Sequence, residues 1–396
     1  MNAVDHLDNL VSANTAQLKI SAIKEMAMLS AKVEDAASLA WGLPSFKTPE
    51  YIRQGVIDAL QQDIDIGKYT LPDGLPELRR LVAEKHELAT GIAVDSDRNV
   101  MITAGNMQGL STIFHVITNP GDEIILTDPC FASHIQQIRQ GGGKPVYWAL
   151  DENNGWSLNL ETLPGLINEK TKAIVIVTPS NPTGKIFSKT ELLGIGRLAK
   201  QHGLLILLDD PYCHFTYDQR HKYFNLASEK DLADHIVYFF TFSKSYAMSG
   251  WRLGYMILPE PLKKEAVKIH DLNMICAPRI SQAAGIVALR GEPLHVLEFE
   301  AVLAKRRELI CSRLDAVPHV FTYNKPEGPY YVFPKIVAKH EDSYEFSLRL
   351  LNKARVTVTP GSAFGPSGEH HVRMAYCVSA DMINRAFDRI ESYFGA

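Results

Sequence analysis

Residues 236–255 read IVYFFTFSKSYAMSGWRLGY, with a single lysine, Lys244, near the middle. The first five residues are continuously apolar and predict a buried strand, which ends in small hydroxyl residues around that lysine. Burial at a strand end lowers the pKa of a lysine, and such an amine is a nucleophile that can form a Schiff base with a carbonyl. A lone lysine after a strand is more often an ordinary surface residue, so the meaning of Lys244 depends on the rest of the chain.

The alternation of apolar strands and helices begins at residue 100. Near-continuous apolar strands between amphipathic helices predict an α/β fold, with a large domain built on a mostly parallel seven-stranded sheet between helices. The expected strands are Val100–Thr103, Glu123–Leu126, Pro145–Trp148, Ala173–Val177, Leu204–Leu208, Ile236–Phe240 and Leu253–Ile257. The expected helices between them are Met107–Ile117, Phe131–Gln140, Lys189–His202 and Leu226–Asp231. Little helix separates the last two strands, so one of them could run antiparallel.

The flanking segments predict a second, smaller α+β domain. We expect residues 1–48 to form an N-terminal arm and part of this domain, residues 49–290 the large domain, and residues 291–396 the small C-terminal domain. Thr48-Pro49 is typical of a helix N-cap followed by proline at the first helical position. The other elements expected outside the large sheet are helices over 18–33, 50–62, 75–90, 261–313 (interrupted near 277–279) and 342–353, strands over 356–359 and 371–376, and a final helix.

The composition is that of an ordinary soluble globular protein. The 396 residues are 46% hydrophobic and 22% charged with a net charge of -4, which gives no electrostatic reason to expect nucleic acid or an anionic membrane as partner. No apolar run approaches the ~20 residues needed to span a bilayer, and the N-terminus is not typical of a secretory signal. The five cysteines are scattered without a CxxC pair, which predicts neither a disulfide framework nor a metal site and fits a reducing cytoplasm.

Polar and aromatic residues follow the predicted strands. Ligands of open α/β sheets bind at the carboxyl ends of strands, so these residues are the first candidates for a site. Gly105-Asn106-Met107 opens a helix whose free backbone N–H groups could bind a phosphate. Phe131 could stack on a planar ring, and Asn181 stands in a loop fixed by two prolines.

Asp209 follows a strand so apolar that its carboxylate needs a cationic partner or a metal. Tyr212, three residues on, could reach the same ligand, while Thr241 and Arg252 flank Lys244. Arg373 lies in a predicted strand of the small domain, where a half-buried arginine pairs with a carboxylate that is either internal or part of a ligand.

Each of these residues has a simpler interpretation alone, such as a turn glycine, a core aromatic or a capping aspartate. Together they match pyridoxal 5′-phosphate (PLP), which has a phosphate, a flat ring, a phenolic oxygen, a pyridine nitrogen and an aldehyde. PLP enzymes combine a lysine Schiff base with an acid at the pyridine nitrogen. The set therefore predicts PLP as cofactor.

The ordered motifs resemble those of the class I/II PLP-dependent aminotransferases, the aspartate-aminotransferase-like group of fold type I. The matching segments are Asn181-Pro182-Thr183-Gly184, Asp209 with Tyr212, Ser243-Lys244 and Gly250-Trp251-Arg252-Leu253-Gly254-Tyr255. The resemblance covers about residues 38 to 380. It implies ping-pong transamination between an L-amino acid and a 2-oxo acid through a Lys244 Schiff base.

By motif position the resemblance also implies the role of each residue. Catalysis falls to Lys244, Asp209 and Tyr212. The implied cofactor contacts are Gly105, Asn106, Met107, Phe131, Asn181, Asp209, Tyr212, Thr241, Lys244, Arg252 and Tyr69, and the implied substrate contacts are Gly42, Asn181 and Arg373. Tyr69 resembles the tyrosine that reaches the phosphate of the neighbouring subunit, which implies a homodimer with shared active sites.

Several alternatives stay open at this point. Carbon–sulfur β-lyases and cyclopropane-carboxylate synthases use nearly the same residues. A ligand-sensing transcription regulator is disfavoured, because only about 35 residues precede the fold and the chain is not basic. Aspartate, aromatic, alanine and methionine donors all fit, and the role of Arg279 is undecided. Phe131, Asn106-Met107 and Asp210-Pro211 depart from the commoner residues of the family.

Overall fold

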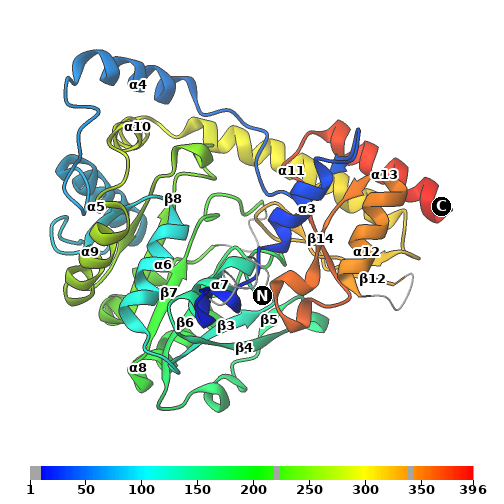
Figure 1. The fold of residues 1–396 in the computed structure, drawn as a ribbon, viewed down its shortest axis with the longest axis horizontal. Coiled ribbons are helices and arrows are strands. Elements are labelled where there is room, and N and C mark those ends of the chain that lie inside the picture. The colour runs from blue at the N-terminus through cyan, green and yellow to red at the C-terminus, as the bar shows by residue number, and fades with distance from the viewer. Residues whose placement is uncertain (1–9, 218–222, 338–341, 396) are drawn as a thin grey trace.

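The computed structural model describes residues 10–217, 223–337 and 342–395 (Figure 1). Its centre is an eight-stranded sheet in the order β2-β9-β8-β7-β6-β3-β4-β5. The strands are β2 (Val100–Thr103), β3 (Glu123–Asp128), β4 (Lys144–Asp151), β5 (Ser157–Leu158), β6 (Thr171–Val177), β7 (Leu205–Asp209), β8 (Ile236–Thr241) and β9 (Gly254–Ile257). All seven expected strands are present, and β5 adds a two-residue strand too short to carry a pattern.

The sheet is mostly parallel, as predicted. Strands β8, β7, β6, β3 and β4 run parallel to one another. Strand β9 is antiparallel to both β2 and β8, because the short loop that carries Lys244 connects it directly to β8. Strand β5 folds back antiparallel onto β4.

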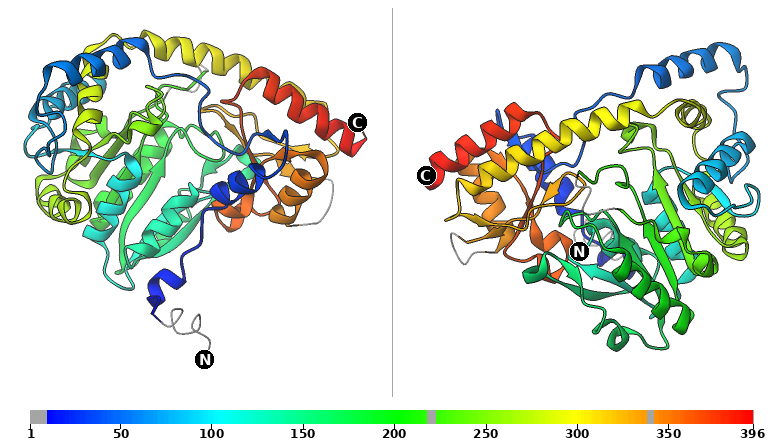
Figure 2. Two further views of the ribbon diagram at one scale, coloured as in Figure 1. Left: turned by 45° about the horizontal axis from the view of Figure 1, so that its top comes forward. Right: turned by 180° about the vertical axis from the view of Figure 1, so that it is seen from behind.

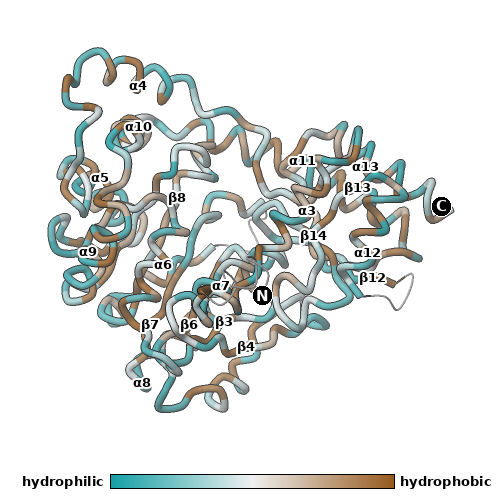
Figure 3. The backbone as a smooth tube through the Cα atoms, in the orientation of Figure 1, coloured by the Kyte–Doolittle hydropathy of each residue, from teal (hydrophilic) through white to brown (hydrophobic). Residues whose placement is uncertain are grey.

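Helices cover both faces of this sheet. Side chains alternate along each strand, so Ile206 and Leu208 face one hydrophobic cluster and Leu207 faces the other. The first face packs α5 (Pro76–Thr90), α8 (Lys189–His202) and α10 (Arg279–Arg290), and the second packs α6 (Asn106–Ile117), α7 (Ala132–Gln140) and α9 (Glu260–Met274). Figure 3 shows hydrophobic stretches along the strands and alternating stretches along the outer helices, as two-sided coverage requires.

A second group of strands and helices lies beside the large sheet. It contains β1 (Ala37–Ser38), β10 (Phe321–Thr322), β11 (Tyr331–Val332), β12 (Lys335–Ile336), β13 (Val356–Thr357), β14 (Thr359–Pro360), β15 (Val372–Ala375), α12 (Ser343–Arg349) and α13 (Ala380–Phe394). β1 pairs with β13, so residues before the large sheet share a hydrophobic core with the C-terminal part of the chain. The long helix α11 (Leu294–Asp315) runs from the end of α10 to this group in both views of Figure 2.

The first helices extend from this second group. α3 (Ala22–Ser30) lies beside β14, and the Ser30 hydroxyl is 2.7 Å from the Thr357 hydroxyl. The short helix α2 (Ala13–Ala16) contacts α7, where the Asn14 amide donates to the Gln140 carbonyl. α4 (Glu50–Gln62) packs on α10 at the opposite end of the molecule from the C-terminus (Figure 1).

Some local predictions were wrong. Thr48 does not cap α4, which begins at Glu50 after Pro49. Its hydroxyl instead donates to the Ala247 carbonyl and accepts from the Trp251 indole, so a tertiary contact of the lysine loop takes the place of the cap. The helix expected over 226–231 is a pair of 3₁₀ segments, Leu226–Ser228 and Lys230–His235. The strand expected over 356–359 is divided into β13 and β14, which pair with different partners.

No helix within the described ranges has the length and apolar character that a membrane crossing requires.

Candidate active site

The carboxyl edge of the large sheet gathers the predicted residues. Asp209 is the last residue of β7 and Thr241 the last of β8, and these two strands are neighbours. Thr241 pairs with Gly254 at the start of β9, whose other neighbour, β2, leads through Ala104 into Gly105. The lysine loop leaves β8 at the same edge. The structure therefore brings these predicted residues together at the carboxyl edge, where the rule for open α/β sheets expects ligands.

An anion corner forms where Gly105, Asn106, Met107, Thr241 and Arg252 meet. Gly105 caps α6 with a φ of 81°, and a Cβ there would lie 2.6 Å from Arg252 Nη2. The guanidinium donates to the carbonyls of Ala104 (3.2 Å) and Ser249 (2.8 Å), and no described carboxylate pairs with it. A helix N-terminus beside an unneutralised guanidinium favours a bound anion.

The Asp209 carboxylate is buried and held at both oxygens. The Asn106 amide donates to Oδ1 at 2.7 Å, and His134 Nε2 donates to Oδ2 at 3.2 Å. The partners among the described residues are thus an amide and an imidazole, and the imidazole forms an ion pair with Asp209 when it is protonated. Among the described residues no cluster of metal-ligating side chains occurs.

His134 belongs to the same helix as Phe131, the N-cap of α7. The two rings meet edge to face with centroids 5.2 Å apart. A spacing of three residues puts them on one face of the helix, a signal that could have found His134 from the sequence.

Lys244 reaches out of the large sheet toward the arm. Its Nζ donates to the Gly42 carbonyl at 3.1 Å and lies 5.9 Å from the centre of the Tyr212 ring. The lysine loop is anchored at Ser245, whose hydroxyl is 2.9 Å from His214 Nδ1 and whose carbonyl accepts from His295 Nε2 at 3.1 Å. These contacts restrict the backbone on which the amine stands.

Arg373 approaches from β15 and is 1% exposed. Its guanidinium donates to Asn181 Oδ1 at 3.1 Å and to the Ala40 carbonyl at 2.5 Å, and it lies 4.6 Å from the centre of the Tyr331 ring. Burial lowers the pKa of Arg373, yet a guanidinium keeps its proton in proteins. No described carboxylate pairs with it, and its buried Nε has no partner.

Asn181 and Tyr212 follow strands of the large sheet and contact residues of the second group of strands and helices. The Asn181 amide nitrogen donates to the Tyr212 hydroxyl at 3.4 Å, and that hydroxyl is 3.1 Å from the Tyr331 hydroxyl. Burial raises the pKa of the Tyr212 phenol, which therefore carries its proton at neutral pH. A Cβ at Gly42 would lie 2.0 Å from the Tyr331 hydroxyl, so glycine allows the arm to pass this ring. Sequence reasoning missed Tyr331, because nothing in the sequence pairs β11 with β15.

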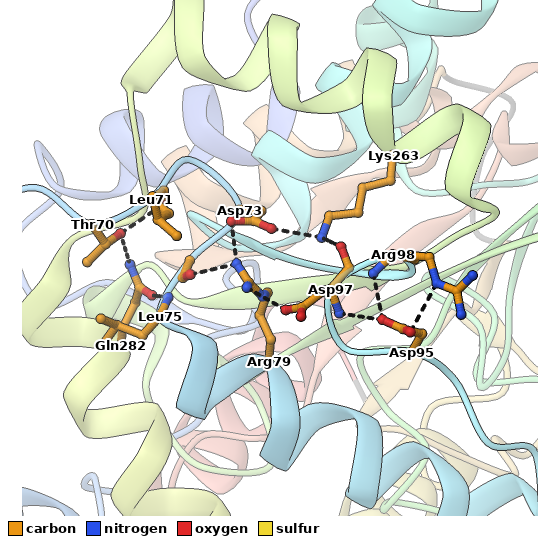
Figure 4. A network of polar contacts seen from close by, with 11 residues as sticks. Thr70, Leu71, Asp73, Leu75, Arg79, Asp95, Asp97, Arg98, Lys263 and Gln282 are labelled. Carbon is orange, nitrogen blue, oxygen red and sulfur yellow. Dashed lines mark hydrogen bonds and ion pairs between the residues drawn. The ribbon is translucent and has the colours of Figure 1, made fainter.

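Tyr69 is not part of this cluster. It is 73% exposed, on a loop held by a network of polar contacts (Figure 4). Gln282 donates to the Thr70 hydroxyl at 3.0 Å and accepts from the Leu75 backbone at 2.7 Å, and Asp73 forms ion pairs with Arg79 and Lys263. Met107, also predicted at the site, is 38% exposed at the start of α6.

The chain belongs to the class I and II aminotransferases, since the sequence model of that family, "Aminotransferase class I and II", matches residues 34–390. It is 35% identical to an aspartate aminotransferase of Pyrococcus abyssi, over 94% of this chain and 95% of that protein. An aromatic-amino-acid aminotransferase of Thermococcus litoralis is 35% identical, again over 94% and 95%. A solved structure of a mutant Thermus thermophilus aspartate aminotransferase superposes with a TM-score of 0.90 at 29% identity, covering 96% of this chain and 99% of that one.

The protein is therefore a PLP-dependent transaminase, as the motifs predicted. The geometry fits that cofactor in three respects. Gly105 leaves a gap beside Arg252 that a side chain would fill, Asp209 offers a buried carboxylate, and Lys244 offers an amine on the same side of the sheet.

Proposed function

We propose that the residues of this site divide the work of transamination by their positions. PLP, when bound, supplies an electron sink for the substrate and a carbon that carries the amino group. The Lys244 amine holds the cofactor covalently and then moves the proton between the substrate Cα and the cofactor. Asp209 faces the pyridine nitrogen, while Tyr212 and Asn181 donate to the phenolic oxygen.

The anion corner holds the phosphate in this proposal. The backbone N–H groups that open α6 donate to it, with Thr241 and Arg252 completing the set. Phe131 stacks on the ring. The Gly42 carbonyl accepts from Lys244 Nζ, which supports a role of the arm in binding the substrate.

Arg373 is the observation that carries the proposal. A buried guanidinium without a carboxylate partner is costly, and a substrate α-carboxylate supplies the missing charge in a bidentate pair. Such a site binds amino acids and 2-oxo acids alike, because both carry that carboxylate. The same residue thus serves both halves of a ping-pong reaction.

Substitution of Arg373 tests this assignment. Arg373→Met is expected to raise the KM of both the amino acid and the 2-oxo acid by roughly 10- to 100-fold, which corresponds to loss of a charged hydrogen-bonded pair. The affinity for PLP, measured by fluorescence titration of the apoprotein, should stay within about threefold. Arg313→Met is the matched control, since Arg313 pairs with Asp388 and Glu391 away from the site. An unchanged KM in Arg373→Met would exclude the carboxylate role.

The proposal includes a homodimer with shared active sites. Tyr69 is exposed but stands on a loop whose polar contacts order it, and ordering an exposed aromatic is useful when a second chain receives it. Further exposed apolar side chains, Leu60, Ile64, Leu71 and Leu272, flank the same end of the molecule. Sedimentation velocity of the wild type and of Ile64→Asp tests the dimer, with a monomer expected only for the variant.

The side chain of the amino acid that donates the amino group is a separate question. Arg279 forms an ion pair with Asp63 in the same chain, so it is not a free cation for a second substrate carboxylate. Trp41 is 59% exposed beside Gly42. These two features favour aromatic over acidic donors. A panel of amino donors with 2-oxoglutarate, followed by half-reaction spectra, decides between them, and a preference for aspartate would exclude this choice.

Domain limits and location complete the proposal. We divide the chain into the arm (1–48), the large domain (49–290) and the small domain (291–396), which is supported by the separate hydrophobic core that Ala37 and Leu39 share with C-terminal residues. A cytoplasmic location is supported by the five cysteines, all of which carry free thiols. Nothing in the comparisons favours the β-lyase.

A further inference from the structure

The backbone and the side chain of Asn106 lie at two different places of the site. It is the first residue of α6, so its backbone belongs to the anion corner, while its buried side chain points to another strand end. The amide nitrogen lies 2.7 Å from Asp209 Oδ1. Strands β2 and β7, which lead to these two residues, are separated in the sheet by β9 and β8. This hydrogen bond therefore connects two distant parts of the site.

The room for this side chain comes from Gly254 at the start of β9. A Cβ at Gly254 would lie 3.0 Å from Asn106 Oδ1, 3.1 Å from Gly105 Cα and 2.9 Å from the Phe240 carbonyl. Any larger residue at position 254 would displace the amide. Glycine at position 254 is therefore required by a close approach of neighbouring atoms rather than by a turn.

The Asn106 amide is oriented for Asp209 at a cost. Its Oδ1 is buried without a hydrogen-bond partner, which is unfavourable for a polar group. Its nitrogen, in contrast, makes a charge-assisted bond to a carboxylate. Buried groups left without a partner are rare in folded proteins, and they gather where function requires them.

We propose that Asn106 is a positioning residue for Asp209. With Asn106 on Oδ1 and His134 on Oδ2, each carboxylate oxygen has a fixed donor, and the carboxylate cannot rotate about its terminal bond. Its remaining lone pairs are then aimed at the pyridine nitrogen of PLP. This inference rests on the proposed role of Asp209. Alanine or serine at position 106 lacks the length to make the bond, so the device depends on the departure from the commoner residues.

Cofactor analogues separate this role from the phosphate contact. Apoprotein is titrated with PLP and with its 1-deaza analogue, in which carbon replaces the pyridine nitrogen, and tryptophan fluorescence reports binding. Asn106→Ala should weaken PLP about tenfold and leave the affinity for the analogue within about twofold, because only the first ligand uses Asp209. The kcat should fall with the KM of the amino acid unchanged.

Matched variants complete the design. Asn119→Ala removes the amide of an exposed residue just after α6, which donates to Asp122 instead, and it should affect neither affinity. Asn106→Ser repeats the test with a different small residue, in case one variant fails to fold by circular dichroism. Asn106→Asp places two carboxylates together and should weaken PLP more than Asn106→Ala does.

The results separate the positioning role of Asn106 from the proposed role of Asp209. Equal weakening of PLP and of the analogue by Asn106→Ala and Asn106→Ser would overturn the positioning role, because it would show an effect on the phosphate or the fold. Unchanged affinity for both ligands would overturn it as well. Asp209→Asn is measured in parallel. If Asp209→Asn itself fails to discriminate the two ligands, the proposed role of Asp209 is wrong; if it discriminates and Asn106→Ala does not, only the present inference is wrong.

Discussion

Asp209 and Asp210 are adjacent in the sequence, yet they face opposite sides of the large sheet. Asp209 shares the face of Leu207 and meets Asn106 of α6 and His134 of α7. Asp210 shares the face of Leu208 and meets Tyr223 and Tyr238. Both carboxyls are buried, so burial alone does not mark a catalytic acid. The alternation of a strand decides which of the two faces the proposed site.

The hydrogen-bond donors around the two carboxyls also differ. Asp209 receives one N–H at each oxygen, whereas both phenols donate to Asp210 Oδ2 and leave Oδ1 buried without a partner. Burial raises the pKa of Asp210 to about 7, against the lowering effect of the two tyrosine hydrogen bonds. Asp210 therefore carries a proton through much of the acidic range and holds the hydroxyls of Tyr223 and Tyr238.

The largest difference between the two aspartates is expected when each carboxyl is replaced by an amide. Asp209→Asn should lower kcat by roughly 10²–10³-fold, since it removes the charge opposite the pyridine nitrogen in a buried site. Asp210→Asn should change kcat by less than about threefold, because its carboxyl contacts Tyr223 and Tyr238 rather than the residues of the proposed site. Steady-state kinetics at pH 7 measure both. Equal losses in the two variants would contradict the division of roles.

The next largest effect is expected in the pH dependence of stability, which should follow the titration of Asp210. An unfolded aspartate loses its proton near pH 4, whereas Asp210 in the folded protein keeps it to about pH 7. The stability that this proton contributes is fully present below about pH 4 and is lost as the pH rises to about 7. Asp210→Asn cannot titrate there. Between these pH values the Tm of the wild-type apoprotein should fall relative to Asp210→Asn by at least about 2 °C.

Differential scanning calorimetry of both apoproteins across this range makes the measurement. Parallel Tm curves would show that Asp210 titrates alike in the folded and unfolded states.

A smaller effect is expected at the tyrosines. Tyr223→Phe removes a donor from Asp210 Oδ2 and should cost about 1 kcal/mol of unfolding free energy. Because that hydrogen bond lowers the pKa of Asp210, its loss should move the upper end of the pH window to higher pH. Tyr238→Phe is the matched variant, with the same expected direction. In both variants kcat should stay near the wild-type value. A pH window of the stability change that moves to lower pH in both variants would contradict hydrogen bonds that lower the pKa of Asp210.

The same comparison shows what could be predicted from the sequence. Strand periodicity and the rule for strand ends brought Asp209, Thr241, Lys244 and Gly105 to one edge correctly, because both depend on local pattern. The side-chain partners of Asp209 were not predictable in the same way. Asn106 reaches it across two intervening strands, and a sequence does not state the strand order.

Tertiary contacts also account for the failures. Thr48 has the sequence of a cap, but its hydroxyl bonds to the lysine loop about 200 residues away. Tyr331 touches both Tyr212 and Gly42 through a pairing of β11 with β15 that no local pattern encodes. Local rules placed the elements and the chemistry, while the residues that orient the reactive groups depend on the assembled fold.

The most direct test of the account is the visible spectrum of the protein after PLP is added and the excess is removed by gel filtration. The wild type should keep a visible band that bleaches with an L-amino acid and returns with a 2-oxo acid. Lys144→Ala, which changes an exposed lysine at the start of β4, should behave in the same way. Lys244→Ala should lose the band and both half-reactions. A Lys244→Ala protein that keeps the band and completes the cycle would contradict the central claim that this amine carries the chemistry.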